Sequence, residues 1–222
     1  MSVLLTASLS ATLPLSAASH VDVVKMRTEN QVNPLGIGTS TPRFSWQITS
    51  DKKGVVQTSY QILVASSREK LDRNEADLWD SGERNSDEQL WIPYQGKALL
   101  SGAQAYWKVR ITTNRGKSEW TEPQLFTIGL LGETKWSGTW IGLEDLQPGE
   151  QKGMHTRLAA RYIRKDFAAK GKVKRAVAYV AGLGVYEFYV NGLRMGGSQA
   201  LQPVPTDYRK TIYYNTFDVT SL

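Results

Sequence analysis

Few residues in this chain could carry out covalent or acid–base chemistry. It has no Cys and only two His, His20 and His155. Without a thiol the chain can form neither a disulfide nor a thiolate metal site, and with two His neither a catalytic triad nor a His-rich metal cluster is expected. The nearest carboxylate pair on one element is Glu144-Asp145, whose adjacent side chains diverge instead of flanking a bond. We therefore predict no catalytic residue, no metal ligand and no resident cofactor.

Aromatic rings and short polar side chains in the C-terminal half make a better case for binding. Aromatic rings can stack on an apolar face of a ligand, and polar groups such as Asn, Asp and Arg can direct hydrogen bonds at it. The candidate residues are Trp136, Trp140, Tyr186, Asn191 and Asp207. Each also has a structural interpretation: the two Trp as packing at a domain junction, Tyr186 as a core ring, Asn191 as a turn residue and Asp207 as a loop carboxylate. Both interpretations stay open at this level.

The chain is basic, with 27 Lys and Arg against 21 Asp and Glu and a formal net charge of +6. Much of the excess lies between Arg157 and Arg175, where Asp166 is the only acidic residue. Such a stretch could attract a polyanion, but here only Tyr162 and Phe167 supply rings for base stacking. We interpret it as the solvated faces of two strands and the turn between them, and expect no nucleic-acid partner.

The elements that must position these residues are predicted to be short β-strands. In the run from Trp107 to Thr112, alternate residues are apolar, so Trp107 should face a core while Lys108 and Arg110 face water. A helical turn is expected around 68–73, and Trp46 is expected in the same core as Trp107. Comparable strand runs are 43–48, 59–66, 78–81, 90–94 and 123–128. This spacing predicts an immunoglobulin-like or fibronectin type III-like β-sandwich.

The strands change character in the second half. Residues 174–181 are apolar on both faces, which predicts a central strand covered on both sides. Residues 186–190 lead into Asn191-Gly192, a dipeptide typical of a tight type I′ turn, with a return strand from Leu193 and a last strand at 211–219. About five strands follow residue 157, whereas a jelly roll needs about eight. We therefore expect a partial, truncated jelly-roll β-sandwich.

The predicted domain boundaries follow from these patterns. Residues 1–19 carry no charge and end in Ser16-Ala17-Ala18-Ser19, which predicts a signal peptide without its basic n-region and an exported protein, periplasmic or extracellular. The segment is too short and too rich in Ser and Thr for a membrane span. We expect a first β-sandwich at 20–130, a linker at 131–156 and the incomplete jelly roll at 157–222.

A series of short motifs, taken in order, resembles the N-terminal region of bacterial α-L-rhamnosidases across residues 23–222. One departure is Ala105-Tyr106, where that family carries an aromatic pair. The motifs are Asn33-Pro34-Leu35-Gly36, Pro42-Arg43-Phe44-Ser45-Trp46, Leu78-Trp79-Asp80-Ser81-Gly82, Trp107-Lys108-Val109-Arg110, Trp140-Ile141-Gly142, Val190-Asn191-Gly192 and Thr206-Asp207-Tyr208-Arg209-Lys210.

The resemblance implies a fibronectin-like domain followed by the rhamnosidase N-terminal β-sandwich. It also implies a downstream (α/α)₆ barrel whose carboxylates hydrolyse terminal α-L-rhamnosyl residues with inversion. Nothing in this chain matches the barrel, so we expect an accessory scaffold, inactive alone, with the barrel and a rhamnose-containing oligo- or polysaccharide as partners.

Two points stay open at the sequence level. In related enzymes such a sandwich can bind rhamnose, in some cases with calcium, but no loop here is dense enough in Asp and Asn to assign a calcium site. The alternative function is a stand-alone secreted carbohydrate-binding or adhesion module without catalysis.

Overall fold

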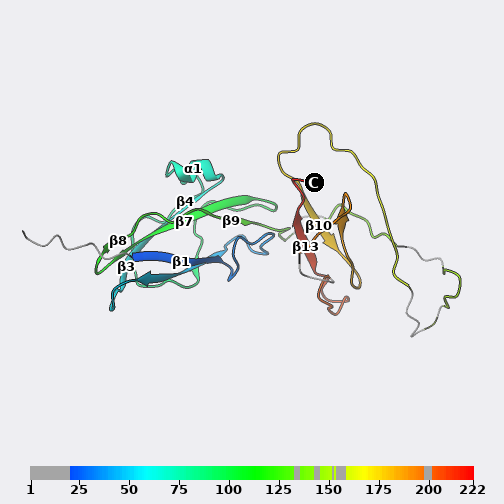
Figure 1. The fold of residues 1–222 in the computed structure, drawn as a ribbon, viewed down its shortest axis with the longest axis horizontal. Coiled ribbons are helices and arrows are strands. Elements are labelled where there is room, and N and C mark those ends of the chain that lie inside the picture. The colour runs from blue at the N-terminus through cyan, green and yellow to red at the C-terminus, as the bar shows by residue number, and fades with distance from the viewer. Residues whose placement is uncertain (1–20, 133–135, 143–145, 152, 154–158, 198–201) are drawn as a thin grey trace, which may run out of the picture. The chain divides into compact units, whose positions relative to one another are not determined.

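The computed structural model of the chain describes residues 21–132, 136–142, 146–151, 153, 159–197 and 202–222. The chain divides between Gly129 and Leu130 into two compact units, called here the first and the second domain. Strands and loops make up nearly all of the described residues, with one short helix (Figure 1), which confirms the all-β class. No helix in this part of the chain is long and apolar enough to cross a membrane. The predicted signal peptide, 1–19, lies outside the described residues.

The first domain is built from two antiparallel sheets, as the sequence predicted. In the first sheet the order is β1 (Val21–Thr28), β2 (Arg43–Ser50) and β6 (Ile92–Pro93). The second sheet is centred on β3 (Gln57–Ala65) and β7 (Gln104–Thr113), flanked by β4 (Trp79–Asp80), β5 (Arg84–Asn85), β8 (Gly116–Lys117) and β9 (Gln124–Thr127). The two sheets enclose one core, which is the arrangement of an immunoglobulin-like sandwich.

An aromatic cluster fills the core of the first domain. Trp46 and Trp107 are fully buried there, as predicted from the sequence. The Phe44 ring lies 4.4 Å from the Trp107 ring and 5.7 Å from the Phe126 ring, centroid to centroid. These contacts join β2 of one sheet to β7 and β9 of the other. Each buried ring contributes about 2–3 kcal/mol to the stability of the sandwich.

Lys108 departs from the alternating pattern, and the prediction that it faces water is wrong. Its residue surface is 5% exposed, and its ammonium donates to the Leu71 carbonyl oxygen at 2.5 Å. The helix α1 (Arg68–Asp72), begun by the Ser67 cap, lies over this part of the sheet and buries Leu71 against it. Burial lowers the pKa of Lys108. The outer face of β7 is therefore a second, small packing surface.

The second domain contains two strand pairs among its described residues. The strands β10 (Val177–Ala181) and β13 (Tyr214–Asp218) pair antiparallel, and β11 (Tyr189–Val190) and β12 (Leu193–Arg194) form a hairpin. The turn residues Asn191 and Gly192 have φ angles of 49° and 81°. The predicted turn and the return strand from Leu193 are therefore confirmed.

The predicted burial of β10 is wrong. Among the described strands it pairs only with β13, and all of its residues are half-buried. The basic segment 159–175 contains no strand, and Tyr162 and Phe167 in it are 102% and 83% exposed. Among the described residues, the β10–β13 pair is contacted on one side by Tyr186 and Phe188.

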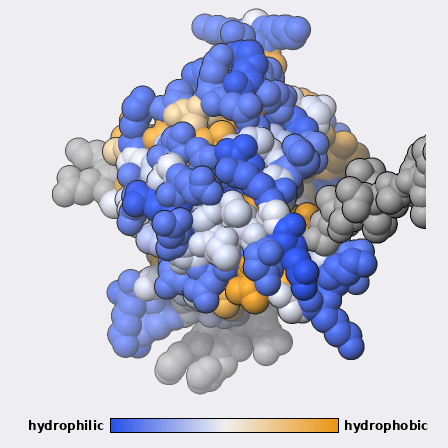
Figure 2. Space-filling model, turned by 90° about the vertical axis from the view of Figure 1, so that its left-hand side faces the viewer, coloured by the Kyte–Doolittle hydropathy of each residue, from blue (hydrophilic) through white to orange (hydrophobic). Residues whose placement is uncertain are grey.

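The surface view in Figure 2 shows a largely hydrophilic face on which hydrophobic residues form small, separate patches. Isolated apolar residues of this kind are ordinary on a folded domain. This face therefore presents no broad hydrophobic surface to a partner.

Candidate functional site

A row of aromatic side chains lies on one face of the strand pair in the second domain. The Trp136 ring lies 5.8 Å from the Tyr214 ring, and the Tyr214 ring lies 5.8 Å from that of Tyr179. The Tyr214 hydroxyl accepts a hydrogen bond of 2.7 Å from the Leu130 N–H, which fixes the middle ring. Trp136 is 45% exposed, and both tyrosines are half-buried.

The register of the strands explains how the two tyrosines come to share a face. Tyr214 is opposite Ala181 and Tyr179 is opposite Thr216, so both point to the same side of the pair. Trp136 reaches this side from the loop that follows the first domain. The aromatic row, Trp136, Tyr179 and Tyr214, offers partly exposed ring faces of the kind that stack on the C–H face of a pyranose.

Tyr186 lies on the opposite side of the same strands. Its hydroxyl oxygen is 3.0 Å from the Val180 carbonyl oxygen and 3.0 Å from the Asn215 side-chain oxygen. Asn215 follows Tyr214 directly, and successive residues of a strand point to opposite faces. Burial raises the pKa of Tyr186 to about 12, so the hydroxyl keeps its proton at neutral pH. Tyr186 thus stabilises the strand pair on the face opposite the aromatic row.

The other three predicted residues lie on separate loops. Trp140 is 62% exposed, and Asn191 is exposed at the tip of the β11–β12 hairpin. The Asp207 carboxylate accepts a hydrogen bond of 3.1 Å from Arg209 Nε, which lowers its pKa. The structure therefore does not gather the five candidates into one site. It places Trp136 beside two tyrosines, Tyr179 and Tyr214, that were not predicted.

An ion pair that the sequence did not reveal stabilises the loops of this domain. Arg161 Nη1 and Nη2 donate to the two oxygens of Glu150 at 2.8 and 2.5 Å, and the two side chains are only 15% and 11% exposed. Glu150 also accepts the N–H groups of Gln147 and Ala159. The Arg161 guanidinium first, and then these amides, lower the pKa of Glu150 to about 2. The two charges lie in turn-like sequence with no periodicity, so nothing in the sequence indicated their pairing.

Eight carboxylates among the described residues have a lowered pKa. In each of them the pKa is lowered by a hydrogen bond or a cation, whereas a glycosidase general acid needs a raised pKa. Within the same residues no group of three or more His, Asp and Glu side chains could hold a metal ion. The Glu144-Asp145 pair lies outside them. The carboxylates concerned are Glu29, Glu69, Glu75, Asp77, Glu83, Glu150, Asp207 and Asp218.

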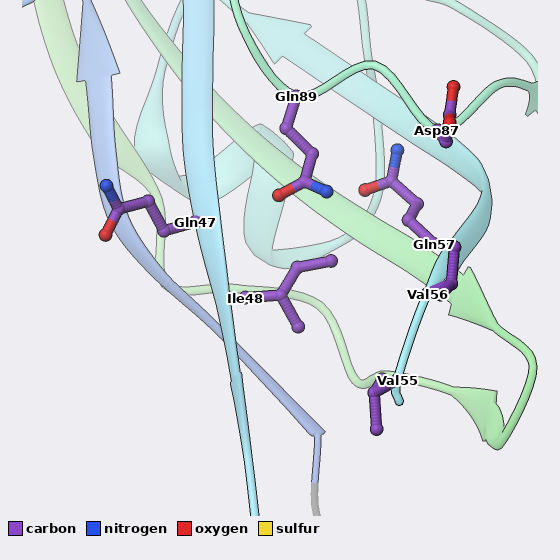
Figure 3. A pocket seen from close by; sticks show the side chains of 7 residues that line it. All are labelled: Gln47, Ile48, Val55, Val56, Gln57, Asp87 and Gln89. Atoms are coloured by element: carbon purple, nitrogen blue, oxygen red, sulfur yellow. The ribbon is translucent and has the colours of Figure 1, made fainter. Parts of the chain in front are cut away.

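A shallow hollow of about 460 Å³ opens in the first domain beside β2 and β3 (Figure 3). The Gln57 amide in its wall is fully engaged, because it accepts from Trp46 Nε1 at 3.0 Å and donates to the carbonyls of Ser86 and Glu88. The remaining lining is Gln47, Ile48, Val55, Val56, Asp87 and Gln89. The hydrogen bonds of Gln57 tie β3 to the loop before β6, so this amide is not available to a ligand.

Two protein-family models match the chain. The first, described as the Rha78A-like N-terminal immunoglobulin domain, matches residues 23–132. The second, described as the α-L-rhamnosidase N-terminal domain, matches residues 171–222. The matches are consecutive and fall in the two domains of the structure.

Whole proteins give the same result. The chain is 35% identical to an α-L-rhamnosidase of Formosa agariphila over 91% of its own length and 23% of that protein. It is 36% identical to an α-L-rhamnosidase of an Alteromonas species over 87% of its length and 21% of that protein. The solved structure of the α-L-rhamnosidase from Dictyoglumus thermophilum superposes with a TM-score of 0.75 at 32% identity, over 89% of this chain and 23% of that one. The chain thus spans less than a quarter of the length of these relatives.

Proposed function

Because the chain belongs to the N-terminal region of the α-L-rhamnosidase family, we propose that it is the accessory part of an enzyme that hydrolyses terminal α-L-rhamnosyl residues. The observation that carries the proposal is the presence of two family domains in sequence, in a chain that spans 21–23% of its relatives.

The proposed chemistry belongs to a catalytic barrel that accompanies this region in the whole enzyme. In an inverting hydrolysis, one carboxyl protonates the leaving oxygen while a second, about 6.5–9.5 Å away, activates a water on the opposite face of the sugar. The test is hydrolysis of 4-nitrophenyl α-L-rhamnopyranoside followed by proton NMR. The enzyme containing this region should release β-L-rhamnose first, and the 222-residue chain alone should release none. Hydrolysis by the chain alone, or initial release of the α-anomer, would contradict the proposal.

The aromatic row supports a second role, the binding of rhamnose-containing saccharides. Half-exposed rings held rigidly by a backbone hydrogen bond lose little entropy on stacking against a sugar. Isothermal titration with a rhamno-oligosaccharide should show binding that Trp136→Ala weakens about tenfold. The matched control is Tyr213→Ala, which removes an exposed ring next to Tyr214 in the chain. Equal losses in both variants would show that the row is not a sugar platform.

The exposed apolar residues of the second domain support the scaffold role. Tyr162, Ile163 and Phe167 are 102%, 53% and 83% exposed, and we propose that the rest of the enzyme covers them. Hydrogen exchange of residues 159–175 should therefore be fast in the 222-residue chain and strongly slowed in the whole enzyme. Equal exchange in both proteins would mean that this segment is no interface.

We also propose that the protein is exported, on the composition of residues 1–19. N-terminal sequencing of the protein from the periplasm and the culture medium should give a start near His20. If the whole protein bound rhamnosides but released no rhamnose, the alternative of a secreted adhesion module would replace the hydrolase.

A further inference from the structure

A strained tryptophan on the outer face of the first domain is not used by the proposed function. Trp91, just before β6, has a φ of 60°, in the left-handed region that a bulky residue rarely adopts. Its surface is 42% exposed, and its backbone N–H donates to the Ser45 hydroxyl at 3.0 Å. Strain at a position of this kind persists only where its surroundings enforce it, and such positions cluster at ligand sites.

Contacts with β2 place Trp91 on the outer side of the β1–β2–β6 sheet. Phe44 faces the core, so its strand neighbours Arg43 and Ser45 point to the other side. The Trp91 ring lies against Arg43, and the Trp91 backbone N–H donates to the Ser45 hydroxyl. Arg27 is opposite Ser45 on the same side. Figure 3 shows Gln47, two residues beyond Ser45, pointing away from Ile48, Gln57 and Gln89. The indole thus lies on an outer sheet face that also presents two guanidinium groups and an amide.

Arg43 is held against the Trp91 ring by an ion pair with Glu29. Its guanidinium carbon lies 4.1 Å from the centroid of the Trp91 ring. Glu29 accepts from Arg43 Nε at 3.1 Å and from Nη2 at 2.7 Å, and its pKa is lowered by that pairing. The described residues offer no hydrogen-bond partner to Arg43 Nη1, which leaves one directed donor beside the ring. One face of the indole is covered by the guanidinium, so the exposed area belongs mainly to the rest of the ring.

We propose that Trp91, Arg43 and Gln47 form a saccharide-binding platform on the first domain, with the indole stacking on a pyranose ring. The indole face that the Arg43 guanidinium does not cover can stack on sugar C–H groups. The Arg43 donor, and the Gln47 amide on the same side of the sheet, can supply directed hydrogen bonds to hydroxyls. The choice of a rhamnoside as ligand rests on the proposed function, whereas the site rests on the geometry of the first domain. It is separate from the aromatic row, because all of its residues belong to the first domain.

The test is an indole ¹H–¹⁵N NMR titration of the 222-residue chain with methyl α-L-rhamnoside and, in parallel, methyl α-D-glucoside. The Trp91 signal, assigned with Trp91→Phe, should shift on titration, and Trp91→Gly should weaken binding at this site about tenfold. Because Gly adopts a φ of 60° without strain, Trp91→Gly should keep the melting temperature of the parent. Leu90→Ala, which removes the exposed neighbouring side chain, is the matched control and should change neither quantity.

The outcomes separate the site from the proposed function. A Trp91 shift with either sugar supports the platform, and a shift with the glucoside alone would support the platform while counting against a rhamnoside ligand. A Trp91 signal that responds to neither sugar overturns the platform, even if the Trp136 signal responds. A fall in melting temperature in Trp91→Gly without loss of binding would make Trp91 a structural residue. If the Trp91 signal shifted in the whole enzyme relative to the 222-residue chain but responded to neither sugar, Trp91 would be a contact between domains instead.

Discussion

At the scale of single residues, Gln57 shows how a polar side chain can be essential to an aromatic core. Its amide satisfies the buried indole N–H of Trp46 and two backbone carbonyls, those of Ser86 and Glu88. Gln57→Leu should lower the free energy of unfolding of the first domain by about 3 kcal/mol, because it leaves these buried groups without partners. Urea unfolding followed by Trp fluorescence measures the loss. Gln47→Leu, at an exposed position of the neighbouring strand, should change it little, and equal effects would contradict the argument.

Glu150 makes the stability of the second domain depend on pH in acid. Its pKa is lowered from 4.5 to about 2 in the folded chain, so the folded state binds its proton less readily than the unfolded state. The stabilisation is therefore complete above about pH 4.5 and is lost as the pH falls towards 2. The protection factors of residues 146–151 and 159–163, taken relative to the intrinsic exchange rate at each pH, should fall as the pH is lowered over this range. In Glu150→Gln this fall should be absent, while Asp166→Asn, at an exposed ion pair, should retain it.

At the scale of elements, the β11–β12 hairpin depends on backbone freedom at its turn. Gly192 has a φ of 81°, and an added Cβ would meet no atom within 4 Å. Any cost of substitution there is thus conformational, and Gly192→Val should destabilise the second domain by about 1–2 kcal/mol. Urea unfolding measures this cost. Gly142→Ala is the matched control, since Gly142 is equally open but has no positive φ; a similar loss there would point to packing instead.

The elements also show what the sequence can and cannot predict. Local signals were sufficient for the Asn191-Gly192 turn, the helix near 68–73 and the core positions of Trp46 and Trp107, because each depends on neighbouring residues. Lys108 was misplaced because its burial depends on α1, which follows another strand and covers the sheet from outside.

For a related reason, the sequence did not show which aromatic side chains the structure brings together. Trp136 and Tyr186 lie on opposite sides of the strand pair, and these sides are set by the pairing of Ala181 with Tyr214. The two residues are about thirty positions apart, and their own residue types do not determine the register of the strands. Tyr179 and Tyr214 look like ordinary strand residues in the sequence. Only the register brings them beside Trp136.

At the scale of the whole molecule, the order of motifs predicted the family and the two β-domains more securely than any single site. Seven short motifs in matching order across both domains indicate a common family, whereas a binding site depends on the distances between a few side chains, which the motifs do not contain. The two family matches, at 23–132 and 171–222, follow the same order. The accessory function therefore rests on the chain as a whole, and the sugar platforms rest on local geometry.

The two domains differ in how much core they possess, and this predicts unequal stability. Phe44, Trp46, Trp107 and Phe126 are all fully buried in the first domain, whereas the buried apolar residues among the described residues of the second are Pro203 and Phe217, which packs 5.3 Å from Phe188. Hydrogen exchange of the 222-residue chain should therefore be slow in β3 and β7 and much faster in β10 and β13, because less apolar area resists opening there. Phe126→Ala should cost about 3–5 kcal/mol and accelerate exchange within residues 21–129 only. Phe217→Ala should accelerate it within residues 130–222 only, and acceleration in both domains by either variant would show that they unfold as one unit.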